Sequence, residues 1–500
     1  MRPRRFEPIQ EPTPLSPQAG RGAGREGSSD GLFLLVGTAL ILTSAAPVAR
    51  AAEKKAGPPN IIFLLTDDQR WDTLGCMGNP IIRTPNIDRL AEQGVVFENC
   101  FVTTSICMTN RACIFTGQYA ARHGIWDFRT SFTPGQLADT YVGRLKRAGY
   151  HLGFIGKWGV GKPPEALFDF NRAWPGQNRY LHKDGQRLSH LTTIMGRQAL
   201  DFLADLPADR PFCLSFSFKS PHCQDGNPER FPEEWKQAYG RFPGQFLYDP
   251  KLERLYQDVT IPPPPLGRPE FFAALPAFLR ESENRVRWNI RFSTPEKYQE
   301  SVKSYYRLIT GVDRVVGDIV AELKERGLAE NTVIMLTGDN GFYLGERGFA
   351  GKWYPHEVSI HVPLVVYDPR LPAEQRDTRR ARIVLSIDVA PTLLALAGVD
   401  VPERMQGESL LPLVRGEEPE WRTEFFCEHL FRHPRIPRTE GVRTEQTKYI
   451  RFLDVDPPYE ELYDLRADPD EAHNLAGRPD QAKLLDEMRA KWRAWRKRAK

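Results

Sequence analysis

The sequence has little excess charge of either sign. Its 500 residues include 68 Lys and Arg and 64 Asp and Glu, which give a formal net charge of +4. Such a balance does not indicate a nucleic-acid partner, and we interpret the basic end of the chain, MRAKWRAWRKRAK, as the solvated face of a helix. The hydrophobic content of 41% is typical of a globular protein with a large core, and no internal repeat is evident.

Cysteine and histidine are also sparse. The chain has seven Cys and ten His, and they form no cluster with the spacing of a zinc site. The cysteine spacing is irregular, so it assigns no disulfide. An odd number of cysteines is compatible with one cysteine that has a different chemical role from the others.

Long apolar runs are scarce, and the one at 31–49, GLFLLVGTALILTSAAPVA, precedes the small-x-small tripeptide ARA at 49–51. This pattern is typical of an export signal that is cut after Ala51, so residues 1–51 are predicted to be an export segment. An uncleaved membrane anchor is the competing interpretation. The first interpretation predicts a periplasmic or secreted protein with no stable membrane span after cleavage.

Four apolar stretches have the pattern of strands that are buried on both faces, as in a parallel sheet. They are NIIFLLTDDQ (60–69), YHLGFIGKWG (150–159), PFCLSFSFKSPH (211–222) and NTVIMLTGDNG (331–341). Each ends in acidic or basic residues, and ligands collect at the carboxyl ends of such strands. The predicted fold class is therefore α/β, with a large doubly wound, mostly parallel sheet flanked by helices.

The helical pattern is clearest at 295–326, where apolar residues recur in alternating steps of four and three. Thr294 is expected to cap this helix, and Gly327 is expected to end it. After about residue 410 the pattern changes to short antiparallel strands and a C-terminal helix from about 478. We therefore predict a catalytic domain at 52–410 and a small C-terminal α+β domain with a short antiparallel sheet at 411–500.

Two of the predicted strands end in oxygen-bearing side chains: Asp67 and Asp68 after the first, and Asp339 and Asn340 after the last. Calcium or magnesium prefers this kind of donor set. Taken alone, an Asp-Asp pair could equally be a helix cap or a solvated turn. Two such clusters on matching strands favour a metal site.

The stretch TTSICMTNRACIFTG raises a question about the thiol of Cys107. If Thr109 or Asn110 caps a helix that ends at Gly117, Cys107 lies at the helix N-terminus, where the dipole and the free amides favour a thiolate or a bound anion. Arg111 lies one turn along and offers a fork of donors to an oxyanion. A cation site and an anion-binding helix end together indicate chemistry on a charged tetrahedral ester, phosphate or sulfate.

From about Asn60 to Leu475 the chain resembles the type I sulfatases of the alkaline-phosphatase-like superfamily. The segment CMTNRACIFTG is similar to the family signature Cys-x-Pro-Ser-Arg followed by Thr-Gly. The motifs GKWGVG, SPH, TGDNG, GKWYPHEVSIHVPLVVYDP, APTLLALAGV and EELYDLRADPDEAHNL follow in the family's order. So many motifs in order make the resemblance specific.

The resemblance implies an exported sulfate-ester hydrolase whose signature cysteine is oxidised to formylglycine by a maturation enzyme. In the family, one hydroxyl of the hydrated aldehyde attacks sulfur and the other later expels sulfate. Carried over by position, Lys157 and Lys352 bind the sulfate, His222 helps to protonate the leaving alcohol and Arg111 fixes the formylglycine. One Ca²⁺ per chain is implied, held by Asp67, Asp68, Asp339, Asn340 and the modified Cys107. The implied substrate is a sulfated small molecule or glycan, and a sulfated polysaccharide is expected by analogy.

The chain departs from the family pattern at several positions. Thr109 and Asn110 replace the Pro and Ser of the signature, which the maturation enzyme reads. Gly159 stands where the family has the His of Gly-Lys-Trp-His, which in the family assists collapse of the sulfo-enzyme, and His123 is a candidate substitute. His361 stands where Arg is common and is expected to affect packing only.

Two alternatives remain at this point. One is a phosphodiesterase or phosphonate monoester hydrolase of the same superfamily, which would have a similar fold and metal site. The other is a noncatalytic relative that binds sulfated glycans, suggested by Thr109 and Gly159. Substrate specificity is expected to lie in 165–195, 223–290 and the C-terminal domain.

Overall fold

The computed structural model describes residues 57–500 except 185–186, 227 and 240–244. The predicted export segment, 1–51, lies outside the described residues. Within the described ranges, no helix is long and apolar enough to cross a membrane.

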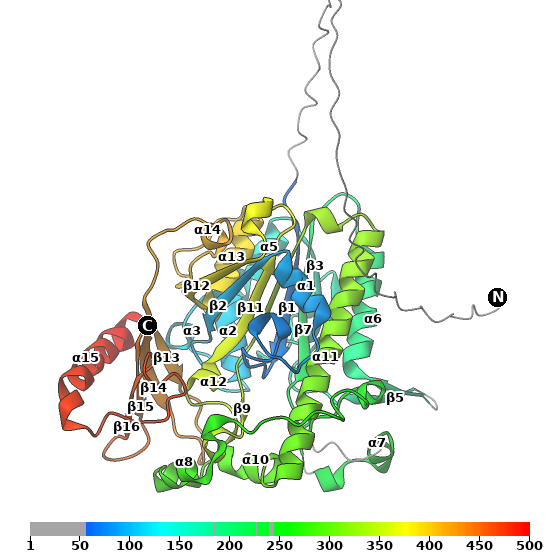
Figure 1. Ribbon diagram of the computed structural model, residues 1–500. Helices are drawn as coiled ribbons and strands as arrows, with labels where there is room; N and C mark the ends of the chain where they lie inside the picture. Colours follow the sequence, from blue (N-terminus) through cyan, green and yellow to red (C-terminus); the bar gives the residue numbers. More distant parts are fainter. Residues whose placement is uncertain (1–56, 185–186, 227, 240–244) are drawn as a thin grey trace, which may run out of the picture. The chain divides into compact units, whose positions relative to one another are not determined.

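An eight-stranded sheet forms the centre of the fold, in the order β12-β2-β11-β8-β1-β7-β3-β4 (Figure 1). All neighbouring strands are parallel except the two pairs that involve β11. This confirms the predicted mostly parallel sheet. Its strands are β1 (Asn60–Asp67), β2 (Val95–Phe101), β3 (His151–Lys157), β4 (Phe170–Trp174), β7 (Phe212–Pro221), β8 (Thr332–Gly338), β11 (His361–Tyr367) and β12 (Thr378–Leu385).

The pairing of β1 with β8 positions the predicted acidic clusters. The two strands run in parallel from Asn60 opposite Thr332 to Thr66 opposite Gly338. Parallel strands in this register end at the same edge of the sheet, so the residues that follow them are neighbours in space. Every residue of both strands is buried, which explains their continuous apolar sequence.

Helices cover both faces of the sheet, and strand β1 shows why. Ile61, Phe63 and Leu65 belong to one apolar core, and the alternate residues Ile62 and Leu64 belong to another. A strand that buries both faces needs a helical layer on each side. The first core includes residues of α2 (Cys107–Thr116), α5 (Tyr141–Arg147) and α13 (Val389–Leu396), and the second includes residues of α1 (Pro85–Glu92), α6 (Leu191–Ala204) and α11 (Pro295–Glu325).

Helix α11 confirms the predicted helix and its cap. The Thr294 hydroxyl accepts a hydrogen bond from the backbone N–H of Lys297 at 3.3 Å, and Pro295 takes the first helical position. The helix ends at Glu325, and Gly327 follows with φ +69°.

Short elements connect the sheet to its surroundings. The Pro-rich region 223–290, in which part of the substrate specificity is expected to lie, contains short helices. The short helices of the whole fold are α3 (Ala120–His123), α4 (Pro134–Asp139), α7 (Glu233–Gln237), α8 (Pro269–Ala273), α9 (Ala277–Arg280), α10 (Glu283–Arg291), α12 (Glu357–Ile360) and α14 (Leu411–Val414). Two-stranded ribbons pair β5 (Leu181–Asp184) with β6 (Arg187–His190) and β9 (Tyr343–Leu344) with β10 (Ala350–Gly351).

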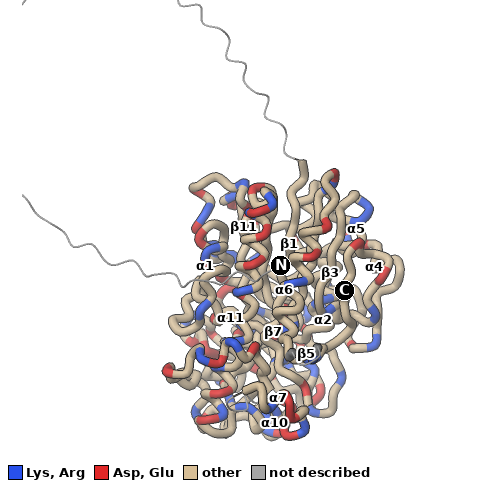
Figure 2. The backbone as a smooth tube through the Cα atoms, turned by 90° about the vertical axis from the view of Figure 1, so that its right-hand side faces the viewer, with Lys and Arg blue, Asp and Glu red and all other residues tan. Residues whose placement is uncertain are grey.

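The C-terminal region contains the expected antiparallel sheet, with four strands in sequence order. Helix α15 packs on it: the indole N–H groups of Trp492 and Trp495 donate to Glu440 and Glu424, each at 2.8 Å. The basic end of the chain is thus a helix with an aromatic face packed on the sheet, and Figure 2 shows Lys and Arg interspersed with Asp and Glu along the chain. The elements are β13 (Glu424–His429), β14 (Thr439–Thr444), β15 (Thr447–Phe452), β16 (Glu460–Asp464) and α15 (Ala482–Arg498).

Candidate active site

Cys107 is the first residue of helix α2, and only 4% of its surface is exposed. The helix therefore begins earlier than the sequence predicts, and the proposed caps Thr109 and Asn110 were wrong. Ile106 is the N-cap, in an extended conformation, and its carbonyl accepts from the N–H of Asn110 at 2.9 Å. Gly117, at φ +65°, ends the helix as predicted.

The side chain of Asn110 has a different use from capping. Its amide nitrogen donates to the backbone carbonyl of Asp339 at 2.7 Å, and its carbonyl accepts from the Ser386 hydroxyl at 2.7 Å. This side chain connects the helix that carries Cys107 to the end of strand β8.

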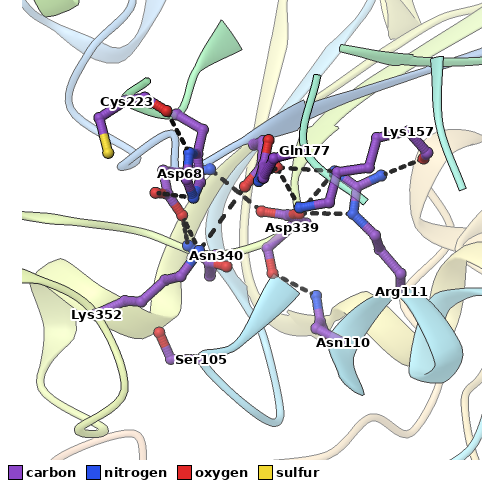
Figure 3. Close-up of polar contacts among 12 residues, drawn as sticks. Asp68, Ser105, Asn110, Arg111, Lys157, Gln177, Cys223, Asp339, Asn340 and Lys352 are labelled. Atoms are coloured by element: carbon purple, nitrogen blue, oxygen red, sulfur yellow. Dashed lines mark hydrogen bonds and ion pairs between the residues drawn. The ribbon is translucent and has the colours of Figure 1, made fainter. Parts of the chain in front are cut away.

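The four oxygen-bearing residues of the two strand ends do meet (Figure 3). The backbone N–H of Asp68 donates to Asp339 Oδ1 at 3.2 Å, and Asn340 Nδ2 donates to Asp68 Oδ1 at 2.7 Å. Asp68 has φ +64°, an unfavourable conformation for a residue with a side chain. Tyr305, from helix α11, donates its hydroxyl to the Asp68 carbonyl and supports that conformation.

Two lysines reach this acidic cluster from opposite sides (Figure 3). Lys157, at the end of β3, places its Nζ 2.6 Å from Asp67 Oδ2. Lys352 forms a buried ion pair with Asp68. His222, just after β7, has its Nε2 3.5 Å from Asp68 Oδ2.

Arg111 is fully buried, and its guanidinium contacts several elements. Nε and Nη2 lie 2.8 and 2.7 Å from Asp339 Oδ2. Nη1 donates to the Lys157 carbonyl at 2.8 Å and also contacts the Ser217 hydroxyl. The side chain therefore joins α2, β3, β7 and the end of β8.

Two further polar residues belong to the site and were missed by sequence reasoning. Ser217 contacts Arg111, and Gln177 Nε2 donates to Asp67 Oδ2 at 3.1 Å. Ser217 lies in the middle of an apolar strand and Gln177 in an irregular connection, so no local pattern marks either of them.

The charges at the site shift one another's pKa values. Burial disfavours ionisation of Asp67, but Lys157, His222, Lys352 and Arg111 outweigh it and hold the pKa of this carboxyl well below its usual value. Burial opposes the protonated form of His222, yet Asp68 and Asp67 raise its pKa to about 10. Both carboxylates therefore favour the protonated form of His222.

The donor set fits a divalent cation. The buried oxygens Asp67 Oδ1 and Asn340 Oδ1 accept no hydrogen bond from any described residue. One carboxylate oxygen each of Asp67 and Asp339 and the sulfur of Cys107 lie within 4.8 Å of one another. Buried acceptors without donors, in a site of carboxylate and amide oxygens, suit a hard cation such as calcium.

A cavity of about 590 Å³ opens over Cys107. The side chains of Lys157, His222 and Lys352 line it, although they come from separate segments of the chain. Part of its remaining wall comes from the three regions in which specificity was expected. These residues are Pro175, Gly176 and Gln177 from the first, Asp225, Glu283 and Arg287 from the second, and Phe431, His433 and Ile436 from the C-terminal region.

His123 does not replace the histidine that is missing at 159, and this suggestion was wrong. Its Nε2 lies 3.3 Å from the sulfur of Cys113, and its Nδ1 accepts from the N–H of Ile125. Burial lowers the pKa of His123 to about 3, and the ring is directed into the apolar core. His361, in contrast, packs as expected, stacked on Trp71 with ring centres 4.8 Å apart.

Gly159 has no room for a side chain. Its φ is +83°, and a Cβ atom there would lie 2.5 Å from Cδ of Arg111. The stem of Arg111 thus passes through the space that a side chain at position 159 would need.

All seven cysteines lie in the described part of the chain, and each is a free thiol.

Comparison with known proteins agrees with this geometry. The sulfatase family profile matches residues 59–399, and the profile of the C-terminal region of N-sulphoglucosamine sulphohydrolase matches 345–498. The N-acetylglucosamine-6-O-sulfatase of Bacteroides thetaiotaomicron is 29% identical, over 92% of this chain and 90% of its own length. Human N-sulphoglucosamine sulphohydrolase is 25% identical, over 88% of this chain and 90% of its own length.

Solved structures show the same fold. An enzyme in complex with its substrate D-glucosamine-2-N,6-O-disulfate superposes with a TM-score of 0.70 and 25% identity, covering 88% of this chain and 98% of that one. The phosphonate monoester hydrolase of Agrobacterium radiobacter superposes with a TM-score of 0.67 at 22% identity, over 88% of this chain and 96% of that one, a likeness of fold.

Enzymes of the sulfatase family generally use a formylglycine and a metal ion, and the acidic cluster beside Cys107 is where such an ion would bind. A family profile that spans most of the chain, relatives aligned over nearly their full length and a shared fold lead to one assignment: the chain belongs to the sulfatase family and is a sulfuric ester hydrolase.

Proposed function

We propose that this chain is an exported sulfatase of sulfated carbohydrates, which uses a formylglycine made from Cys107 and one bound Ca²⁺. The observation that carries the proposal is the position of Cys107. It begins a helix at the floor of a cavity that Lys157, His222 and Lys352 also line, next to the carboxylates of Asp67 and Asp339.

In this proposal Ca²⁺ is held by Asp67, Asp68, Asp339 and Asn340 together with an oxygen of the modified residue 107. The sulfur of Cys107 stands in for that oxygen in the structure. The hydrated aldehyde of formylglycine supplies a nucleophilic hydroxyl and a second hydroxyl for release of sulfate. A sulfur atom would lack that second hydroxyl, so the modification explains repeated turnover.

The chain's own residues bind the sulfate and place its charges. Lys157 and Lys352 are buried cations at the cavity, and each has its ammonium beside an acidic ligand of the metal site. We propose that they contact the sulfate oxygens, where fixed positive charge stabilises the transition state. Arg111 holds the modified residue through its fixed guanidinium.

His222 is proposed to donate a proton to the oxygen of the leaving alcohol. Its Nδ1 lies 2.7 Å from the carbonyl of Cys223, which fixes the ring, and its Nε2 is directed toward Asp68 at the cavity. The carboxylates of Asp68 and Asp67 favour the protonated form of this ring, which a general acid needs.

The names of the relatives support a carbohydrate substrate. The two compared enzymes are an N-acetylglucosamine-6-O-sulfatase and an N-sulphoglucosamine sulphohydrolase, and both align over most of this chain. The cavity is within the usual size range of a small-molecule site, and its wall combines aromatic and charged side chains, as a sugar requires. Export is part of the proposal because residues 31–51 have the pattern of an export signal. Contact with a formylglycine-generating enzyme is also part of it, because Cys107 has to be converted.

A panel of substrates tests the proposal. Purified protein from a host that makes formylglycine should release sulfate from sulfated glucosamines and from an aryl sulfate, and lose this activity on chelation of calcium. Phosphonate monoesters and phosphodiesters belong in the same panel because phosphonate hydrolases share the fold. Preference for a phosphonate would favour that alternative, and binding of sulfated glycans without turnover would favour a noncatalytic relative.

A further inference from the structure

Helix α10 contributes a further cationic group to the wall of the cavity, Arg287. Arg287 lines the same cavity as Cys107 and Lys352, and 28% of its side chain is exposed. It has no contact with the acidic cluster that the proposed mechanism uses. The mechanism therefore leaves this arginine without a role.

The guanidinium of Arg287 is fixed in orientation, but not all of its N–H donors are used in hydrogen bonds. Its Nε donates to Glu283 at 3.1 Å, and its plane lies over the ring of Trp353, 4.8 Å from the ring centre. No hydrogen bond joins its two terminal nitrogens to any other residue of the described chain. Two parallel N–H donors on a fixed plane match the geometry of a sulfate or a carboxylate.

Glu283, which accepts a hydrogen bond from Arg287, is itself held in place by other contacts. The Glu283 carboxylate also accepts from Arg435 at 2.6 Å, and the N–H of Glu283 donates to the carbonyl of Arg435 at 2.9 Å. These contacts hold the start of α10 against the C-terminal region. Arg287 therefore needs little reorganisation to bind an anion, which favours affinity.

Trp353 connects this arginine to the sulfate-binding side of the cavity. It directly follows Lys352 in the chain and has φ +92°, an unfavourable conformation for any residue except glycine. That turn directs Lys352 toward the acidic cluster while the indole of Trp353 lies under Arg287. Two anion-binding groups are thus supported by consecutive residues at one cavity.

Asp225 carries a negative charge on the same wall. The Cys223 thiol lies 3.9 Å from its carboxylate, which also interacts electrostatically with Arg287. A carboxylate repels an anion and accepts hydrogen bonds from hydroxyl groups. The same wall therefore carries a cation that can bind an anionic group, Arg287, and a carboxylate that can accept hydrogen bonds from the hydroxyls of a sugar.

We propose that Arg287 determines specificity for a second anionic group of the substrate, a sulfate or a carboxylate close to the sulfate that is cleaved. The preferred substrate is then a sugar that carries two negative groups. This inference rests on the proposed function and adds to it the charge of the substrate.

Steady-state kinetics on matched sugars test the inference. The probes are glucosamine 6-O-sulfate, glucosamine 2-N,6-O-disulfate, and a sulfated disaccharide with and without its uronate carboxylate. The wild-type kcat/KM should be about tenfold or more higher for the doubly charged member of at least one pair, as a charge-assisted contact provides. The pair that shows the difference tells whether the second group is a sulfate or a carboxylate.

The variant Arg287→Gln should reduce that preference to about twofold or less, mainly through KM. Its loss should be larger on the doubly charged sugar than on the singly charged one. Arg280→Gln is the matched control: it removes the same charge from an exposed position on α9 that does not line the cavity, and the preference should stay. Arg287→Lys should restore only part of it, because an ammonium lacks the planar fork.

The outcomes distinguish a failure of the proposed role of Arg287 from a failure of the proposed sulfatase function. Hydrolysis without any preference, or a preference that survives Arg287→Gln, overturns the role of Arg287 and leaves the sulfatase proposal intact. Release of no sulfate from any sugar or aryl sulfate overturns the proposed function. Calorimetric binding of the same sugars to Cys107→Ala then tests Arg287 independently of turnover: equal affinity for both members of every pair contradicts the inference.

Discussion

Arg111 and Asp339 form an ion pair with no exposed surface on either side chain, and two guanidinium nitrogens contact the same carboxylate oxygen at 2.8 and 2.7 Å. The pair joins helix α2, which begins with Cys107, to the end of β8, which supplies two of the proposed metal ligands. A buried ion pair adds little net stability, but removing one partner leaves a costly charge behind. The geometry of the nucleophile and that of the metal site are therefore coupled.

Asp339→Ala should abolish Ca²⁺ binding and activity together. It should also lower the free energy of unfolding by about 3–5 kcal/mol, because Arg111 would remain buried without its partner. Calcium binding by calorimetry, sulfate release and thermal unfolding measure the three effects. Asp400→Ala, at an exposed loop position, is the control. Activity of Asp339→Ala that persists after chelation would contradict the metal assignment.

Cys107→Ala should keep the fold and lose turnover, because it removes one small side chain at a cavity. Cys107→Ser should at most transfer one sulfate, unless the host converts serine. Mass spectrometry of the peptide spanning 103–122 from the native host should show formylglycine, despite Thr109. Cys113→Ala is a control within the same helix: this buried thiol contacts His123 in the core, so its loss should cost about 1 kcal/mol of stability and leave the modification in place. Unmodified cysteine in an active enzyme would refute the proposed nucleophile.

Introducing the family's histidine, as Gly159→His, should lower activity. The new Cβ would displace the stem of Arg111, and φ +83° at this position is strained for any side chain. Gly149→Ala is the matched control, because Gly149 has φ +88° but no atom within 4 Å of the added Cβ. We expect Gly149→Ala to cost about 1–2 kcal/mol of stability with kcat retained, and Gly159→Ala to reduce both. Higher activity in Gly159→His would show that Arg111 can move aside.

The stability of the protein should fall as the pH rises toward 8, because of Glu428. Burial raises the pKa of this carboxyl from 4.5 to about 8, although the N–H of Ala121 donates to it. A carboxyl that binds its proton more tightly when folded contributes its full stability below pH 4.5 and loses it as the pH rises through 8. Each unit between these limits costs about 1.4 kcal/mol at most.

Glu428→Gln should flatten this dependence, because the amide resembles the protonated acid. Denaturant unfolding at several pH values measures the slope, with Glu417→Gln as the exposed control. An equal slope in wild type and Glu428→Gln would assign the pH dependence to other groups.

The parts of the site that follow from the sequence are those encoded by strand ends. The buried runs of β1 and β8 each finish in two oxygen-bearing residues, and their parallel pairing brings Asp67 and Asp339 together. Lys157 and His222 likewise follow the apolar strands β3 and β7. A local sequence pattern is enough to predict these site residues, because the parallel sheet brings the ends of its strands together.

Other features depend on contacts that no sequence pattern marks. Helix α2 begins at Cys107 behind an apolar N-cap, Ile106, so no polar residue signals its start. The role of Gln177 depends on Asp67, 110 residues earlier, and His123 was misjudged because its partner is the thiol of Cys113. Such contacts follow from packing in three dimensions and leave no periodic trace in the sequence.

The cavity has two kinds of wall, and this division has an evolutionary consequence. Its floor includes Lys157, the last residue of the buried strand β3, and His222, the residue that follows β7, so the sheet itself positions both. Its rim is made by short helices and C-terminal loops, among them Arg287 and the half-exposed Phe128, which no strand requires for its packing. Descendants of this gene can therefore acquire new sugar preferences by exchanging rim residues while the sulfur chemistry is inherited unchanged.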